Sequence, residues 1–244
     1  MSSSHDTMAL HGWTAVPVDA KAILGGRSYI NKPEPLLAKD IPFPSNDPIV
    51  AQIHAYAKEK LPLQTFNHSM RVYYFAMAIL HQQFPSHSTL SPSTLALTSL
   101  LHDIGTTPSD LRATQLSFEF YGGILALSLL WSETSPSASQ SQAEAVAEAI
   151  IRHQDMGTTG KITFLGQLVQ LATLYDNTGG NPELVSKETR DDVNREFPRG
   201  GWEGCFARTI GEEIGLKPWA HTTHLGEEEF PRSVLGNDLM RGYP

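Results

Sequence analysis

Four side chains of metal-ligand type lie on helical stretches that are otherwise apolar: His68, His102, Asp103 and Asp176. His68 lies eleven residues before Ile79, and Asp176 lies eleven residues after Leu165. Because eleven residues at about 100° each make about three full turns, each polar side chain shares the helix face of its apolar partner. The His-Asp pair extends the apolar face of the run that precedes it. The spacing therefore predicts that all four side chains face the core.

Burying these four groups without partners would be unfavourable, at about 2–7 kcal/mol for a neutral polar group and more for a charge. A bound metal removes that cost, because neutral imidazoles and ionised carboxylates become its ligands. Two nitrogen and two oxygen donors suit Zn²⁺, Fe²⁺ or Mn²⁺ better than Ca²⁺ or a cysteine-type structural zinc site. Taken singly, each position also fits a hydrogen-bonded core histidine or a helix-capping aspartate. The joint pattern on separate helices favours a metal.

His153 is a fifth inward-facing polar residue, because it falls in line with Val146 and Ile150 at the end of an expected helix. Three roles fit this position. His153 can bind a second metal, it can donate and accept a proton beside the first metal, or it can cap the helix, where the helix dipole favours a cation. We favour acid–base chemistry or substrate contact over the capping role.

The elements that would position these residues are helices. Asp47-Pro48 and Ser91-Pro92 are typical helix starts, and Gly105 followed by Pro108 is a typical helix end. The expected helices cover residues 48–60, 65–84, 92 to about 104, 117–131, 142–152, 163–177 and 182–196. The absence of strand alternation and of internal repeats predicts an all-α fold.

Glycine and proline content sets the expected domain organisation. Residues 1–47 are rich in Pro, Gly and Ser, which precludes a long helix and predicts an arm that is packed on the body or partly disordered. Residues 48–244 are expected to form the helical catalytic domain. Its last part, residues 197–244, has many Gly and Pro residues and is expected to form an irregular C-terminal tail of loops and short helical turns.

Composition narrows the class of protein. The 244 residues are 40% hydrophobic and 18% charged, with a formal net charge of −8, so binding to nucleic acid or to an anionic membrane is not expected. Cys205 is the only cysteine, which excludes an intrachain disulfide and fits a reducing compartment. No apolar stretch approaches the roughly 20 residues that span a bilayer, and no secretory signal is evident. A cytoplasmic location is expected.

Several strings resemble the fungal cyanamide hydratases, a family of the HD-domain metal-dependent hydrolase superfamily. The superfamily pattern is H…HD…D, which His68, His102-Asp103 and Asp176 match. The resemblance runs from about Gly12 to about Gly226. The strings that carry it are Asn67–Val72, Leu100–Ile104, Ser117–Gly123, Ala147–Asp155, Leu171–Asn177 and Lys217–Thr223.

This resemblance implies an HD-domain helical bundle and a zinc-dependent carbon–nitrogen lyase that hydrates cyanamide to urea. The four ligand candidates would hold one Zn²⁺ per chain, although the ligand set alone would also admit Fe²⁺ or Mn²⁺. The substrate is small and neutral, and its nitrile carbon would be attacked by metal-bound hydroxide. A homo-oligomer is expected.

Further site residues are assigned from the same chemistry. Attack on the nitrile builds negative charge on nitrogen, and His153 is expected to handle the proton that neutralises it. Glu119 is expected to orient a ligand histidine or a water, although a solvated helix carboxylate fits equally. Asn67 is expected to hydrogen-bond the amine end of the substrate or to fix a neighbour. Phe120, with its aromatic neighbours, is expected to wall the pocket or to belong to the core.

Two other functions remain open at this stage. An HD-type phosphohydrolase acting on a nucleotide would need cations for phosphate, and Arg71, Arg112 and Arg152 are the nearest candidates. A non-catalytic helical protein with a structural metal would need a closed set of four ligands. His221 and His224 form an H-x-x-H pair in an expected loop, for which a second metal site is a minor alternative.

Overall fold

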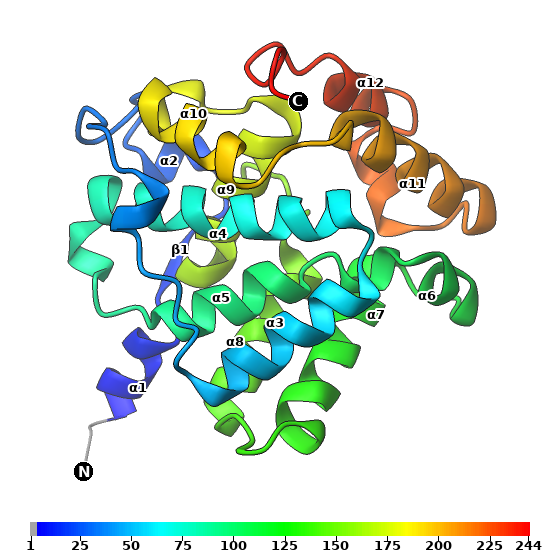
Figure 1. Ribbon diagram of the computed structural model, residues 1–244, viewed down its shortest axis with the longest axis horizontal. Helices are drawn as coiled ribbons and strands as arrows, with labels where there is room; N and C mark the ends of the chain where they lie inside the picture. The colour runs from blue at the N-terminus through cyan, green and yellow to red at the C-terminus, as the bar shows by residue number, and fades with distance from the viewer. Residues whose placement is uncertain (1–3) are drawn as a thin grey trace.

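The computed structural model describes residues 4–244, which form a helical bundle around one long buried helix. This helix is α4, Leu63–Gln83, and it crosses the middle of the molecule in Figure 1. Its neighbours include α3, α5, α9, α10 and α11. The α-helices have the bounds Ser4–Leu10 (α1), Ala20–Ile23 (α2), Pro48–Lys60 (α3), Leu63–Gln83 (α4), Pro92–Leu101 (α5), Pro108–Ala113 (α6), Phe118–Ser128 (α7), Gln140–Arg152 (α8), Phe164–Thr178 (α9), Lys187–Glu196 (α10), Trp202–Leu216 (α11) and Glu229–Leu235 (α12).

The helix starts follow the capping signals of the sequence. Asp47 accepts a hydrogen bond from the Ile49 amide at the start of α3, and Ser91 accepts one from the Thr94 amide at the start of α5. In each helix a proline occupies the first turn, where no amide donor is needed. The predicted helices are therefore confirmed, with ends that differ by a few residues. The segment at 182–196 is divided into a short turn, η5 (Pro182–Leu184), and α10.

The N-terminal arm is packed on the body over the residues that the structure describes. Its strand β1, Ala15–Pro17, pairs antiparallel with β2, Lys161–Thr163, in the register Val16 with Ile162. Further along the arm, the Gln83 side-chain oxygen accepts hydrogen bonds from two arm amides, and Asp192 accepts one from the Ala38 amide. Of the two states expected for the arm, the packed one is present. The two three-residue strands are too short to show alternation in the sequence.

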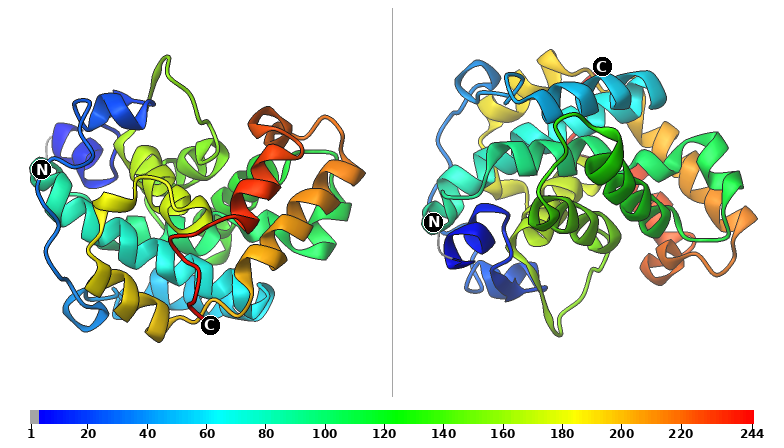
Figure 2. Two further views of the ribbon diagram at one scale, coloured as in Figure 1. Left: turned by 90° about the horizontal axis from the view of Figure 1, so that it is seen from above. Right: turned by 90° about the horizontal axis from the view of Figure 1, so that it is seen from below.

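The C-terminal region is more regular than predicted. Instead of loops with short turns, residues 202–216 form the 15-residue helix α11, against which α12 packs (Figure 2). The glycines of this segment suggested loops, but Trp202, Phe206 and Ile210 repeat every four residues and give the helix one apolar face. That face forms a separate small core with Phe230 and Val234 of α12. Burial of this face outweighs the poor helix propensity of glycine.

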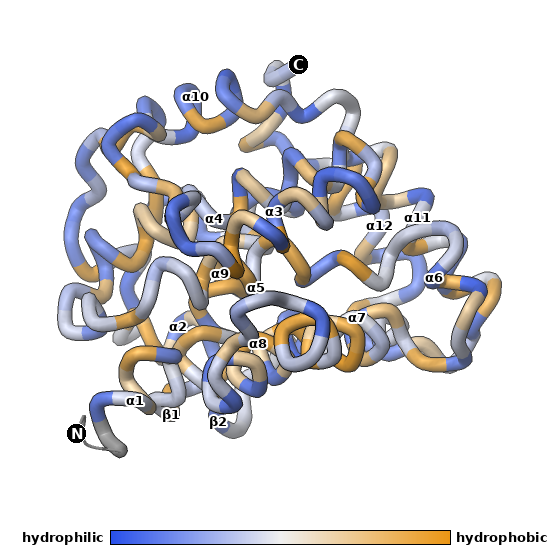
Figure 3. Tube along the Cα trace, turned by 60° about the horizontal axis from the view of Figure 1, so that its bottom comes forward, coloured by the Kyte–Doolittle hydropathy of each residue, from blue (hydrophilic) through white to orange (hydrophobic). Residues whose placement is uncertain are grey.

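Hydropathy follows the same arrangement. In Figure 3 the apolar stretches gather along the helices at the centre, including α5 and α9, whereas α10 at the edge is largely hydrophilic. The main core is continuous through α3, α4, α5, α8 and α9. Among the described residues, no helix is long and apolar enough to cross a membrane.

A glycine fixes the distance between the His-Asp turn and α7. Gly105 lies in the short turn η3, Ile104–Thr106, directly after Asp103. A Cβ atom at Gly105 would lie 2.3 Å from the Phe118 carbonyl oxygen, which is backbone and cannot swing away. Only glycine therefore allows the turn to approach the start of α7 so closely.

We predict that Gly105→Ala destabilises the fold by about 1–3 kcal/mol, the usual cost of overpacking a tight contact. Gly211→Ala is the matched control, because its added methyl group meets nothing within 4 Å and replaces a helical glycine in α11. The control should gain up to about 1 kcal/mol. Urea unfolding measures both changes, and equal stability of Gly105→Ala and the wild type would contradict the prediction.

Candidate metal centre

His68, His102 and Asp103 converge at the centre of the bundle, His68 from α4 and the other two from the end of α5. Their ligand atoms all lie within 4.8 Å of one another. The Nε2 atoms of the two histidines are 3.1 Å apart, and Oδ2 of Asp103 lies 3.3 Å from Nε2 of His102. All three side chains are buried. The structure thus brings three of the four predicted ligands together.

Asp103 is the chemically decisive member of this cluster. Both of its carboxylate oxygens are buried and accept no hydrogen bond from the described residues. Burial alone would raise the pKa of Asp103, but His102, His68 and His153 outweigh it and hold this pKa well below the usual range. A buried carboxylate that stays ionised without hydrogen bonds calls for a cation. The residues therefore fit a divalent metal.

The pKa values of the two imidazoles shift in opposite directions. Burial lowers the pKa of His68 to about 4, so this ring is neutral at ordinary pH and has a lone pair to offer a metal. Burial also acts against a charge on His102, but the adjacent Asp103 carboxylate overcomes it and raises the pKa of His102. A metal cation would replace that proton, as metal binding generally does at a histidine.

Asp176 lies on the opposite edge of His68. One of its oxygens is 2.6 Å from Nδ1 of His68, whereas Nε2 of that ring faces His102. The same carboxylate accepts charge-assisted hydrogen bonds from Arg71 and Arg199, both fully buried. Asp176 as a fourth ligand stays a prediction. In the present ring orientation it holds the imidazole in place, which is how carboxylates commonly act on metal-bound histidines.

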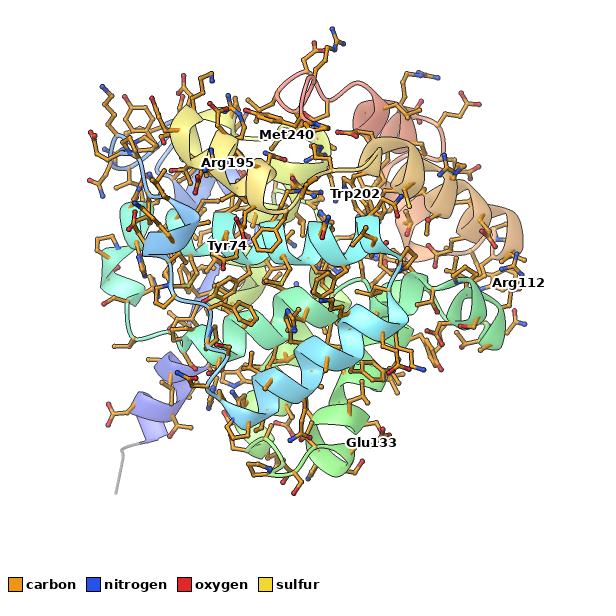
Figure 4. All side chains as sticks on the ribbon, in the orientation of Figure 1. Tyr74, Arg112, Glu133, Arg195, Trp202 and Met240 are labelled. Atoms are coloured by element: carbon orange, nitrogen blue, oxygen red, sulfur yellow. The ribbon has the colours of Figure 1, made fainter. Side chains whose placement is uncertain are left out.

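Trp202 covers the face of His68. The two rings stack with centroids 4.2 Å apart and an interplanar angle of 13°. Figure 4 shows Trp202 above α4, where α11 begins. Its indole Nε1 donates to the Asn177 side chain, 2.8 Å away. The helix that sequence analysis missed therefore supplies one wall of the site.

His153 lies beside the cluster, as predicted. Its Nε2 atom is 4.0 Å from Oδ1 of Asp103, and its ring meets the His102 ring edge-on at 5.3 Å. Nδ1 lies 2.6 Å from the Ile150 carbonyl, to which it donates, so Nε2 keeps its lone pair. Burial and the neighbouring His102 lower the pKa of His153. This neutral ring can therefore accept a proton close to the Asp103 carboxylate.

A small recess opens next to His153. It is lined by His153, Gln154, Met156, Thr173, Leu174, Asn177 and Phe230. Sequence analysis did not single out Gln154 or Asn177, although each directly follows a residue that it did select. Both amide oxygens already accept hydrogen bonds, from Thr222 and Trp202 respectively. The recess therefore presents polar groups beside the proton-accepting ring.

Two other predicted site residues, Glu119 and Phe120, contact His221 and not the cluster. Glu119 is fully buried, so it is not a solvated helix carboxylate; it bonds to His221 at 2.7 Å and not to a ligand histidine. Phe120 stacks on His221, and the ring against His153 is instead that of Phe118. Helical neighbours point about 100° apart, which the sequence spacing could not resolve.

Asn67 also faces away from the cluster. Its side-chain amide donates a hydrogen bond of 2.8 Å to the Pro198 carbonyl, in the segment between α10 and α11. Although Asn67 precedes His68 in the sequence, one residue along a helix turns the side chain to another face. In this structure Asn67 fastens the chain that leads to Trp202, which corresponds to the second expected role, fixing a neighbour.

Comparison with known proteins agrees with this site. Residues 65–178, which contain all four predicted ligands, match the model of the HD domain. Two proteins of Saccharomyces cerevisiae, the cyanamide hydratases DDI2 and DDI3, are each 40% identical to the chain over 230 residues. The match covers 94% of this chain and 98% of each relative. The HD-domain match and the His-His-Asp cluster together indicate a site for a divalent metal.

We predict that His102→Ala removes the metal from the purified protein and lowers its melting temperature, because metal binding adds to the free energy of folding. Elemental analysis measures the metal content per chain. His81→Ala, at an exposed position on the same helix as His68, is the control and should keep the metal. Full occupancy in His102→Ala would show that the cluster is not the metal site.

Proposed function

The chain belongs to the cyanamide hydratase family, and we propose that it adds water across the nitrile bond of cyanamide to give urea. The observation that carries this proposal is the buried Asp103 carboxylate, which lacks hydrogen bonds and lies between two histidines and beside a third. The near full-length similarity to two cyanamide hydratases supports the choice of substrate.

We propose zinc as the metal, one ion per chain. His68, His102 and Asp103 would hold it, with Asp176 as the predicted fourth ligand or, as its present contacts favour, as the group that orients His68. Such a metal lowers the pKa of a water from about 15.7 to about 7 and so supplies a nucleophile at neutral pH. The nitrogen and oxygen donor set favours zinc, iron or manganese, and membership of the family favours zinc.

His153 is proposed to manage the proton at the nitrile nitrogen. Its ring is held by the Ile150 carbonyl at Nδ1, which fixes the tautomer and leaves Nε2 toward the cluster. A neutral imidazole in that orientation can take a proton from water and return it to the nitrogen on which negative charge develops.

Phosphate chemistry is less well supported. Arg71 is fully buried and bound to Asp176, and Arg152 pairs with Asp155 and Glu148. Arg112 forms an exposed ion pair with Glu212. Each guanidinium that the sequence offered for a nucleotide therefore already has an acidic partner. A closed structural metal site is also less well supported, because only three ligand-type residues share one cluster among the described residues, which favours an open coordination position.

We also propose a cytoplasmic location and a homo-oligomeric state. A single, half-buried cysteine supports the reducing cytoplasm as its location. Several large apolar side chains are exposed, among them Ile124, Trp131 and Trp219, which supports the expected homo-oligomer. Light scattering of the purified protein would measure its oligomeric state.

We predict that His153→Ala keeps the metal but loses most of the hydratase activity. General acid–base catalysis is typically worth about 10²–10⁴-fold, so turnover should fall within that range. Urea release from cyanamide measures turnover, and elemental analysis of the same sample measures the metal. Loss of the metal would make His153 a ligand, and near-normal turnover would return it to the role of a helix cap.

We also predict that the metal-stripped protein recovers its activity with Zn²⁺. Zinc combines a borderline donor preference with strong acidification of bound water. The stripped protein is reloaded in parallel with Zn²⁺, Fe²⁺ under anaerobic conditions, and Mn²⁺, and urea release is compared at equal metal content. Activity with iron or manganese but not with zinc would contradict the assignment.

A further inference from the structure

Glu119 and His221 form a pair that lies outside the metal cluster. Glu119 is in the first turn of α7, and His221 begins the short turn η6, His221–Leu225, after α11. Oε1 of Glu119 lies 2.7 Å from Nδ1 of His221. The glutamate is fully buried, whereas the histidine is about a quarter exposed. The pair therefore links a carboxylate in the interior to an imidazole at the surface.

The second oxygen of Glu119 has no partner. Oε2 is buried and accepts no hydrogen bond from the described residues. The ring of Phe118, the residue before Glu119, lies against His153, and the charge of Glu119 acts to raise the pKa of His153 against the lowering effect of burial. A buried carboxylate with one free oxygen, whose charge acts on a proton-handling histidine, is a candidate proton acceptor.

The histidine is built into its position by several contacts. Its backbone amide donates to the Ser117 hydroxyl at 2.8 Å, which joins η6 to the start of α7. Its ring stacks between those of Phe120 and His224, at 5.3 and 4.2 Å. Because the ring cannot turn freely, Nδ1 stays directed at Glu119. The stacked Phe120 thus serves the pair and not the metal.

The charged groups around the pair are mostly acidic. Asp155 lies 3.4 Å from Nε2 of His221, and Glu213 of α11 lies close enough that burial and the charge of Glu119 together raise the pKa of Glu213. The hydrogen bond with Glu119, aided by the charges of Asp155 and Glu213, raises the pKa of His221 against the effect of burial. His224 on η6 and His153 are the other titratable groups that face the pair. His221 is therefore the cation that balances Glu119.

The hydration reaction needs groups that accept protons from water and return them to the substrate. Hydration of cyanamide to urea moves two protons from the water oxygen to the nitrile nitrogen, one when water adds across the triple bond and one when the resulting isourea becomes urea. No proton is gained or lost overall, but each must be held between its loss and its return. His153 is proposed to carry one proton from water to the nitrogen, so a second group that accepts the other proton would complete the cycle.

We propose that His221 holds the buried Glu119 ionised, with Oε2 free to accept the other proton that water loses and to return it during the same turnover. This inference rests on the proposed hydratase function and makes His221 a positioning residue that acts through Glu119. Without the His221 cation, burial and the nearby Glu213 favour the protonated form of this carboxyl. A carboxyl that is already protonated cannot accept the proton from water.

The test replaces His221 with glutamine, which keeps a hydrogen-bond donor but not the charge. In His221→Gln the acidic limb of the kcat/KM profile should move to higher pH by about one to three units, the usual effect of losing an opposite charge at this distance. Glu119→Gln should lose activity at every pH. His81→Ala removes an exposed imidazole of α4 that has no part in the pair, and its acidic limb should match that of the wild type.

Infrared spectroscopy tests the pair without any substrate. A protonated-carboxyl band should appear in His221→Gln at a pH where the wild type has none, and it should be absent from the double variant with Glu119→Gln. An unmoved acidic limb or a missing band overturns the proposal. A wild-type protein that does not hydrate cyanamide refutes the proposed function and with it the catalytic role of the pair, while the band still decides whether His221 keeps Glu119 ionised.

Discussion

The structure depends on how it keeps ionised carboxylates in a medium that does not solvate them. Asp103, Asp176 and Glu119 are all fully buried, and burial acts against the charge of Asp103 and Asp176 unless a partner holds it. Asp176 has two guanidiniums, and Glu119 has an imidazole with a raised pKa. Asp103 has only imidazoles that a metal would deprotonate. Asp103 is therefore the carboxylate that a metal ion would balance, and the ligand atoms of His68 and His102 lie next to it.

The Asp176 network shows why the C-terminal region belongs to the site. Arg199 spans Asp176 and Glu203, and Arg71 spans Asp176 and the Phe197 carbonyl, so α4, α9 and the start of α11 are joined through one buried carboxylate. Breaking such a buried pair typically costs about 3–5 kcal/mol. The same connection brings Trp202 onto His68. Packing of α11 and the geometry of the metal centre are thus set together.

The sequence predicted what is local or periodic, and it missed what is made by contacts through space. Helix starts such as Asp47-Pro48 and the inward faces of His68, His102 and His153 follow from caps and spacing, and the structure confirms them. Helix α11 was missed because its glycines concealed a four-residue apolar repeat. Glu119 and His221 are 102 residues apart in the sequence, so no local pattern predicts their contact.

His153 and His221 have different roles in the proposed chemistry. His153 is neutral, its pKa lowered by burial, and its free Nε2 lies near Asp103, so it works where negative charge develops. His221 is partly exposed and faces acidic groups that raise its pKa, so its protonated form is favoured and can serve as a counter-charge. One residue type thus fills two roles because burial and acidic neighbours act in opposite directions on its pKa. In Glu213, burial and the charge of Glu119 raise the pKa, and the hydrogen bonds that its carboxyl accepts from the Phe118 amide and the Thr222 hydroxyl act against that rise.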